Sequence, residues 1–380
     1  AGIIEVRNAI GGAAEAYAPA VILVEHRIDE FAGPGGVDAL PRRALVLGAD
    51  GAVLADGPTA EVLHRFGPAL HAQGCWLPLS TELEAVFGLA EGLAKPQMRH
   101  ALRSLATPPD LVTAKALTKR VFVTLHAHDL GVAHTGAATV QGELTLSRIN
   151  FSLRAGETTV ILGANGSGKT TLMLTLAGLL PAARGKVTGA RPGMIFQNPE
   201  HQFVGGSVRA EVAYGLPASA APRVDALLKE HRLDHLSEAI PHRLSGGEKR
   251  RLSIAAMLAH QRATLIADEP FYGLDRKGTI DAIAAFRGAA ANGTAVLFSC
   301  HDLRTAATLA DRAIVVAEGT IIADGPVFDV LRDSDIRRRS GLSLPPLLEV
   351  LFDEFDGADG AEQIRQVLDG LNSAVSVVTR

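Results

Sequence analysis

The sequence predicts an α/β fold, with a core sheet and helices on both of its sides. Three apolar runs of strand length support this prediction: Val160–Leu162, Thr264–Ala267 and Ala295–Phe298. A glycine-rich turn and a helical run over residues 171–180 follow the first of them. Apolar runs of strand length beside a helical run are typical of an α/β domain, so we expect one domain of this class in the second half of the chain.

The glycine-rich turn has the spacing of a phosphate-binding loop. Its glycines let the backbone N–H groups point inward at phosphate oxygens, and the following helix start favours anions. Lys169 reaches the β- and γ-phosphates, and the Thr170 hydroxyl can ligate Mg²⁺. The sequence therefore predicts that the chain binds a nucleoside triphosphate. The expected nucleotide-binding residues of the turn are Gly163, Asn165, Gly166, Ser167, Gly168, Lys169, Thr170 and Thr171.

Further along, three motifs supply groups that suit phosphate chemistry. Ser245, Gly246 and Gly247 put a hydroxyl and free N–H groups at a helix start, which again suits a phosphate. Asp268 ends an apolar strand and can hold Mg²⁺ through water, and Glu269 beside it is placed to orient or deprotonate an attacking water. We expect His301, after the next apolar strand, to hydrogen-bond the γ-phosphate and sense its loss.

These pieces, in this order, resemble the ATP-binding cassette (ABC) family: Walker A, signature, Walker B, the D-loop Gly273-Leu274-Asp275, and a switch histidine. The resemblance implies a P-loop NTPase core with an antiparallel β subdomain and a helical signature subdomain. It also implies that Gln197 touches Mg²⁺ and the attacking water. In ABC pairs each ATP lies between one P-loop and the partner's signature, so residues 245–247 would complete the site of an opposed domain.

One branch of the family fits best. Phe196-Gln197-Asn198-Pro199, with Gln202 following, looks like the energy-coupling-factor (ECF) ATPases, which drive uptake of vitamins and of cobalt or nickel. The resemblance implies ATP hydrolysis, a transmembrane coupling subunit, a substrate-binding membrane subunit, and a peripheral position on the cytoplasmic face of the cell membrane. We expect the loop from Gln197 to Gly215 to dock the transmembrane subunit. Its apolar side chains could instead pack internally; they are Phe203, Val204, Val208 and Tyr214.

One position departs from the family pattern. ABC domains usually place an aromatic residue before the first long strand pair, where it stacks on adenine. This chain has Asp129-Leu130-Gly131-Val132-Ala133-His134 at the corresponding stretch, so the resemblance leaves His134 as the candidate for adenine stacking.

The chain also contains a second copy of its own ending. Ala55-Asp56-Gly57-Pro58 parallels Ala323-Asp324-Gly325-Pro326, and Val21–His26 parallels the strand that leads to His301, which makes His26 a second switch histidine. A repeat of this length indicates two domains in tandem. We expect residues 1–93 to be the C-terminal part of a first ABC domain, 94–118 a linker, 119–340 a complete ABC domain, and 341–380 a helical tail. We then expect the coding region to extend upstream and to encode a first P-loop and signature in frame. Otherwise the complete cassette must pair with a copy of itself or with a separate ATPase.

Composition and spacing limit the other classes of function that the sequence could have. The net charge of the chain is −4 and the sequence has no long basic stripe, so the composition does not suggest nucleic-acid binding. The densest basic triplet is Lys249-Arg250-Arg251, which we interpret as lying on a helix surface. Cys75 and Cys300 are expected to be free thiols. The alternative function is a soluble tandem ABC factor that acts on ribosomes, but residues 79–120 lack the strongly basic linker such a factor carries. A DNA-repair ABC ATPase would have a long coiled coil between Lys169 and Ser245, where only 75 residues lie.

Overall fold

The computed structural model describes residues 2–17, 20–25, 27–48, 51–90, 92–106, 122–133 and 144–376. The chain divides into two compact units. Unit 1 comprises Ala1–Asp110, Asp275–Lys277 and Pro346–Arg380, and unit 2 comprises Leu111–Leu274 and Gly278–Pro345.

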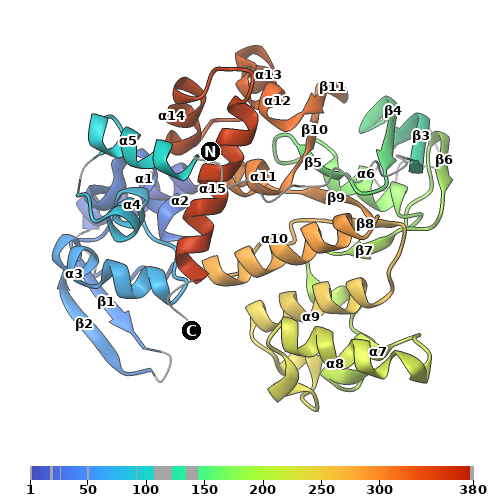
Figure 1. Ribbon diagram of the computed structural model, residues 1–380, viewed down its shortest axis with the longest axis horizontal. Coiled ribbons are helices and arrows are strands. Elements are labelled where there is room, and N and C mark those ends of the chain that lie inside the picture. The colour runs from blue at the N-terminus through green and yellow to red at the C-terminus, as the bar shows by residue number, and fades with distance from the viewer. Residues whose placement is uncertain are drawn as a thin grey trace. The chain divides into compact units, whose positions relative to one another are not determined.

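Unit 2 is built on a six-stranded sheet with the order β11-β10-β5-β9-β8-β7. All neighbours in it are parallel except the edge strand β11, which pairs antiparallel with β10. A second, antiparallel sheet has the order β4-β3-β6 (Figure 1). The strands are β3 (Val123–Val132), β4 (Leu146–Arg154), β5 (Thr158–Leu162), β6 (Arg184–Gly189), β7 (Gly193–Ile195), β8 (Thr264–Ala267), β9 (Ala295–Ser299), β10 (Arg312–Ala317) and β11 (Thr320–Pro326).

The main core of unit 2 lies between these two sheets. Strands β5, β8 and β9 are buried along their whole length because both of their faces are covered. The antiparallel sheet contributes Leu125 and Phe151, helix α6 contributes Leu172, and the parallel sheet contributes Ile266 and Leu297 to one hydrophobic cluster. The predicted α/β core with an antiparallel β subdomain is therefore confirmed.

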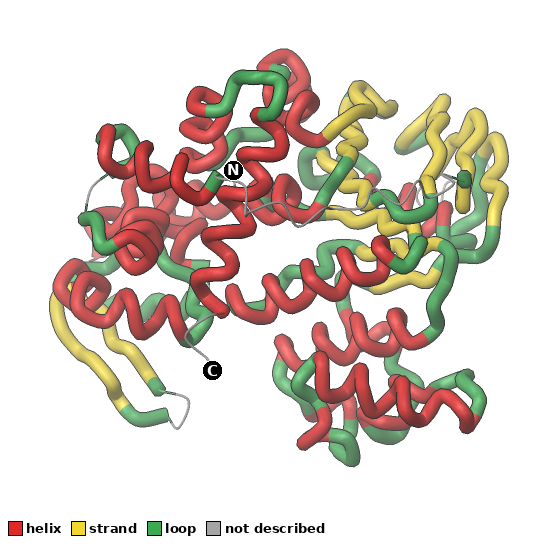
Figure 2. Tube along the Cα trace, in the orientation of Figure 1, coloured by secondary structure: helices red, strands yellow, loops and turns green. Residues whose placement is uncertain are grey.

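A helical arm forms the second core of unit 2. Its helices pack through a separate apolar cluster that includes Val212, Leu228 and Leu252, and Figure 2 shows this part without strands. The helices of unit 2 are α6 (Lys169–Leu176), α7 (Val208–Ala213), α8 (Ala221–Glu230), α9 (Gly246–Ala259), α10 (Arg276–Ala291, whose first two residues belong to unit 1), α11 (Leu303–Leu309), α12 (Val327–Arg332) and α13 (Ser334–Ser340). Short 3₁₀ helices cover Pro199–Gln202, Ala218–Ala220, Asp234–Leu236 and Pro241–Arg243.

Unit 1 combines one hairpin with helices from both ends of the chain. Its elements are α1 (Gly2–Tyr17), α2 (Ile28–Ala32), a 3₁₀ helix (Gly33–Ala39), β1 (Arg43–Leu47), β2 (Val53–Pro58), α3 (Thr59–Ala72), α4 (Leu79–Phe87), α5 (Pro96–Leu105), α14 (Pro346–Glu354) and α15 (Gly360–Ser376). Helix α5 lies in the stretch predicted as a linker, and it buries Met98 and Leu102 completely. Arg99 and Arg103 of α5 both pair with Glu354 of α14.

The internal repeat is visible in the structure. Hairpins β1–β2 and β10–β11 share their register. The arginine that begins the first strand of each hairpin faces the proline that ends the second strand, and each hairpin has one irregularity. In each hairpin that arginine also forms an ion pair with an aspartate, Asp56 or Asp324. Helices α4 and α14 both have nine residues and begin after a proline, 267 residues apart.

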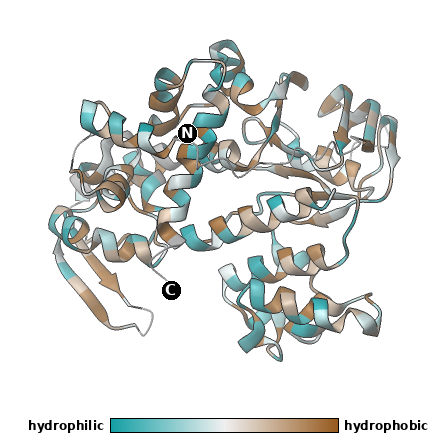
Figure 3. Ribbon diagram, viewed as in Figure 1, coloured by the Kyte–Doolittle hydropathy of each residue, from teal (hydrophilic) through white to brown (hydrophobic). Residues whose placement is uncertain are grey.

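The two copies differ in what covers them. In the second copy Ile314 and Val316 of β10 are fully buried, because β5 pairs with that strand and the core of unit 2 lies beneath it. In the first copy Leu45 and Leu47 of β1 are 55% and 59% exposed, and Figure 3 shows hydrophobic positions along this hairpin. Among the described residues, β2 is the one strand that pairs with β1.

The first copy of the switch-histidine strand does not form. Residues 20–25 have no regular secondary structure, and Ile22 and Val24 are 89% and 86% exposed. Its counterpart β9 is a strand because β5 and β8 flank it on both sides. An isolated apolar run of this length lacks such neighbours, so its strand propensity alone does not suffice. His26 lies outside the described residues.

Candidate nucleotide site

The phosphate-binding loop connects β5 to α6 and is shaped by glycine. Gly163 has φ +149°, and a Cβ there would lie 2.3 Å from the Val316 carbonyl oxygen; Gly168 has φ +98° and is the residue before α6. Lys169 Nζ donates to the carbonyls of Gly163 and Ala164, at 2.8 and 2.9 Å. Burial lowers the pKa of Lys169, and the nearby carboxylates Glu269 and Asp268 partly offset that effect.

The carboxylate at the end of β8 is held from two sides. Asp268 is only 2% exposed. Its Oδ2 accepts a hydrogen bond from Thr170 Oγ1 at 2.7 Å, and its Oδ1 accepts one from Ser299 Oγ at 2.6 Å. The predicted pair Thr170 and Asp268 therefore converges, although the residues are 98 apart in the chain. Ser299, which ends β9, was not singled out from the sequence.

Glu269 and His301 also meet at this edge of the sheet. His301 Nδ1 lies 2.8 Å from Glu269 Oε2. Glu269 has φ +46°, a left-handed conformation that is uncommon for a residue with a side chain. Its backbone N–H donates to Ser299 Oγ at 2.8 Å, so one buried hydroxyl fixes both Glu269 and Asp268.

Gln197 follows β7 and has an exposed side chain. Its backbone carbonyl contacts the helical arm. Arg250 of α9 donates to the carbonyl oxygens of Phe196 and Gln197. The interpretation of Arg250 as a surface residue was wrong, since it is only 2% exposed. Burial lowers its pKa to about 10, against the opposing pull of Glu269 and Asp268. Its neighbour Lys249 forms an ion pair with Glu200.

The signature residues lie at the start of α9. Ser245 caps the helix: its hydroxyl accepts from the Glu248 N–H, and Glu248 accepts from the Ser245 N–H. Gly246 and Gly247 occupy the first turn, where helix N–H groups have no partner within the helix. This is the anion-favouring helix start that the sequence predicted.

The loop fits a phosphate ligand. Among the described residues the Ser167 hydroxyl is buried without a hydrogen-bond partner, whereas Asn165 and Gly166 are exposed. A polar atom of this kind indicates a missing partner. Thr170 and Asp268 offer oxygen donors, which Mg²⁺ prefers, and Mg²⁺ usually takes one or two carboxylates beside substrate phosphates. His134 lies outside the described residues, and Asp275 belongs to unit 1.

The described histidines and cysteines outside the nucleotide site give no evidence for a second site. In the part of the chain that is described, no three His, Cys, Asp or Glu side chains gather as a metal site. His126 and His128 share one face of β3, with ring centroids 6.1 Å apart, and His126 contacts the Ser152 hydroxyl. Cys75 and Cys300 are not joined by a disulfide, and the Cys300 thiol donates to the Asp302 carbonyl at 3.3 Å.

Comparison with known proteins decides the family. A family model described as ABC transporter matches residues 146–272. EcfA of Methanothermobacter thermautotrophicus, named an energy-coupling factor transporter ATP-binding protein, is 34% identical, over 55% of this chain and 75% of EcfA. The chain belongs to the ABC transporter ATPases. These enzymes bind and hydrolyse ATP to power transport in a complex with membrane partners.

Two further relatives of this ABC ATPase are informative. YkoD of Bacillus subtilis (strain 168), named as a candidate HMP/thiamine import ATP-binding protein, is 30% identical over 87% of this chain. The chain spans 60% of the length of YkoD. A solved structure entitled an ATP binding subunit of an ABC transporter is 25% identical, with a TM-score of 0.50, over 61% of this chain and 99% of that one. None of the helices in the described ranges is long and apolar enough to cross a bilayer.

Proposed function

We propose that this chain is the ATP-hydrolysing subunit that powers an ECF-type importer of a vitamin or a transition-metal ion. The observation that carries the proposal is the 34% identity with EcfA over three quarters of that protein. It is supported by the hydrogen bonds that join Thr170 to Asp268, and Asp268 to Glu269 through Ser299. The chain then works at the cytoplasmic face of the cell membrane, beside a transmembrane coupling subunit and a substrate-binding membrane subunit.

Each site residue has a role that its surroundings support. Lys169 and the P-loop N–H groups bind the phosphates of ATP. Thr170, Gln197 and Asp268 would hold Mg²⁺, which when bound neutralises charge on the phosphates. Glu269 orients the attacking water and accepts its proton. Catalysis of this kind is positioning and charge stabilisation, as in other phosphoryl transfers.

His301 is the γ-phosphate sensor in this proposal, and its contact with Glu269 restricts how it can act. Beside an ionised Glu269, the Nδ1 atom of His301 carries the hydrogen of their contact. Its Nε2 then donates to a phosphate oxygen only when the ring is doubly protonated, or when the ring turns away from Glu269. In this proposal, loss of the γ-phosphate removes a hydrogen-bond partner of His301. The contact between His301 and the proposed base Glu269 then changes directly.

The signature serves an opposed ABC domain. Ser245, Gly246 and Gly247 complete the site of that domain. The matched hairpins and helices of the two copies support the assignment of residues 1–93 to the C-terminal part of a first ABC domain. Leu45 and Leu47 of β1 are exposed, whereas their counterparts in β10 are buried.

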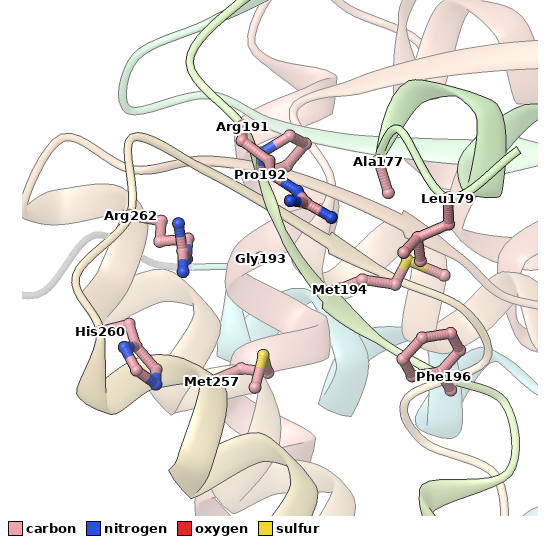
Figure 4. A pocket seen from close by; sticks show the side chains of 10 residues that line it. All are labelled: Ala177, Leu179, Arg191, Pro192, Gly193, Met194, Phe196, Met257, His260 and Arg262. Carbon is pink, nitrogen blue, oxygen red and sulfur yellow. The ribbon is translucent and has the colours of Figure 1, made fainter. Parts of the chain in front are cut away.

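The docking surface for the transmembrane subunit is proposed beside Gln197. A groove of 220 Å³ lies there, lined by apolar side chains from three segments, which include Leu179, Met194, Phe196 and Met257 (Figure 4). Arg191, His260 and Arg262 also line it. An apolar groove with polar side chains at its margin suits an amphipathic helix.

The loop residues first expected to dock divide into two groups. Val208 is fully buried, and Phe203 packs against the core of the helical arm with its ring against His242, so both support internal packing. Val204 and Tyr214 are 62% and 60% exposed. The proposal therefore keeps Val204 and Tyr214 as contact residues outside the lining of the groove.

The test is reconstitution with the membrane subunits. Leu179→Glu and Val204→Glu should release the ATPase from membranes that contain the transmembrane subunit, while Val123→Glu, an exposed position on β3, should not. In proteoliposomes, ATP should drive uptake of a labelled vitamin or of cobalt or nickel. Retained membrane binding by both variants contradicts the docking site. ATP hydrolysis with no binding to any membrane subunit contradicts the proposal that the chain powers an importer.

A further inference from the structure

The proposed base Glu269 lies in a turn that is anchored in the core of unit 2. In that turn Phe271 is only 6% exposed. Its ring packs edge-on against Phe286 of α10 and Phe298 of β9, with ring centroids 5.8 and 5.9 Å away. The Tyr272 N–H donates to the Glu269 carbonyl at 3.2 Å and so closes the turn. The backbone that carries Glu269 and Tyr272 is therefore fixed by contacts within one unit.

The side chain of Tyr272 lies outside that core. Tyr272 is 64% exposed, although Phe271 beside it is buried. Its ring contacts the ring of His301, with the two centroids 6.4 Å apart and the two planes inclined at 65°. These values lie in the range of edge-to-face aromatic contacts. Tyr272 is therefore placed against the same histidine that contacts Glu269.

The backbone beside His301 is held at the start of α11. Asp302 caps that helix, because its Oδ1 accepts from the Arg304 N–H at 2.9 Å and its Oδ2 accepts from the Thr305 hydroxyl at 2.6 Å. On the other side of His301, the Cys300 thiol donates to the Asp302 carbonyl at 3.3 Å. The chain on both sides of His301 is thus fixed, and the freedom that remains lies in its side chain.

The plane of the His301 ring decides how Glu269 is held. The contact between Nδ1 and Glu269 Oε2, at 2.8 Å, fixes one atom of the ring, and the second side-chain torsion of histidine is intrinsically broad. Both side chains are partly exposed, His301 to 43% and Glu269 to 16%, so water competes for this contact. The Tyr272 ring constrains the plane itself, because an edge-to-face contact depends on the angle between the rings. Without that constraint the ring can turn, and Glu269 then loses a donor that orients its carboxylate.

We propose that Tyr272 is a positioning residue for ATP hydrolysis, whose ring holds the His301 imidazole in the plane in which Nδ1 donates to Glu269. The proposal rests on the proposed role of Glu269 as the base. Tyr272 contacts neither the phosphates nor the attacking water in this account, and it acts only through His301. Beside an ionised Glu269 the hydrogen of the contact lies on Nδ1, so a neutral His301 is the Nδ1–H tautomer.

The experiment compares Tyr272→Leu with Tyr272→Phe in the full chain. Leucine removes the ring but keeps an apolar side chain, whereas phenylalanine keeps the ring and removes the hydroxyl. Tyr272→Leu should lower kcat for ATP about fivefold, with KM within about twofold, and Tyr272→Phe should keep the native kcat. Phe122→Leu removes another exposed ring of the same unit and should change neither constant. Urea unfolding should give native stability for all three variants, because substitutions at exposed positions cost little.

Nuclear magnetic resonance of isotope-labelled histidine separates this positioning from a general loss of structure. At about pH 8, where histidine side chains are ordinarily neutral, the shifts of the ring nitrogens distinguish the two tautomers. The native chain and Tyr272→Phe should show the Nδ1–H tautomer at His301, whereas Tyr272→Leu should show a mixture of tautomers. His301→Asn identifies the His301 signal by its loss from the spectrum.

Native kcat in Tyr272→Leu overturns the proposal, as does an Nδ1–H tautomer that persists unchanged in that variant. An equal loss of kcat in Tyr272→Phe and Tyr272→Leu also overturns it, because the hydroxyl and not the ring would then be responsible. If the native chain binds ATP but does not hydrolyse it, the proposed function fails, while a His301 tautomer that depends on the Tyr272 ring still supports the positioning of His301.

Discussion

Replacement of Ser299 by alanine tests how the site is held together. The hydroxyl is fully buried, donates to Asp268 Oδ1 at 2.6 Å and accepts from the Glu269 N–H at 2.8 Å. Alanine fits the same space, so the change removes two hydrogen bonds without overpacking. A buried polar group left without its partner costs about 1–3 kcal/mol, and two such groups are created, so we expect a loss of about 3 kcal/mol in unfolding free energy.

The same variant should affect catalysis more than binding. Glu269 is held in a left-handed conformation, and without Ser299 its N–H no longer fixes that geometry. We expect kcat to fall at least about tenfold while ATP affinity stays within about threefold, because the P-loop is untouched. Thr294→Val, which removes one hydrogen bond to the Arg262 carbonyl just before β9, should cost less than about 1 kcal/mol.

Urea unfolding and steady-state ATP hydrolysis on the native chain, Ser299→Ala and Thr294→Val give these quantities. A Ser299→Ala chain with native stability and native kcat would refute the reasoning.

Two further predictions concern a buried arginine and a buried histidine. Arg250→Met should leave the carbonyls of Phe196 and Gln197 without their donor, lower stability by about 3 kcal/mol and slow ATP hydrolysis, and native behaviour in both assays contradicts its bridging role. His231 is 3% exposed, and burial, with Arg251 and Arg232 nearby, lowers its pKa to about 4. Its unfolded form takes up a proton below pH 6.5, so native stability should fall by up to about 3 kcal/mol as pH drops from 6.5 to 4. His231→Gln should flatten this dependence in urea unfolding at several pH values; an unchanged slope would assign it to other groups.

The sequence was sufficient wherever chemistry follows from local pattern. The turn from Gly163 to Thr170 and the strand ending at Asp268 carry their own signals, and parallel strands that end at one edge bring these residues together. A helical tail over residues 341–380 was likewise predicted, and helices α14 and α15 lie in that stretch.

The sequence was insufficient where burial comes from tertiary contacts. Arg250 looked like a surface charge, because nothing local indicates that its guanidinium finds two backbone carbonyls in the Gln197 loop. Ser299 looked like an ordinary strand end, although its hydroxyl connects Asp268 with Glu269. Residues 21–25 looked like a strand, but a strand forms only beside a partner, and the described part of unit 1 supplies none there.

The central claim is that Glu269 is the base of a P-loop ATPase site, and ATP binding and turnover by Glu269→Gln test it most directly. An amide at that position still hydrogen-bonds water but cannot accept its proton. The account predicts that Glu269→Gln binds ATP as the native chain does and shows no turnover, whereas Lys169→Ala loses affinity for ATP itself. Calorimetry and a phosphate-release assay, with membrane subunits present, measure both. Normal hydrolysis by Glu269→Gln would contradict the account.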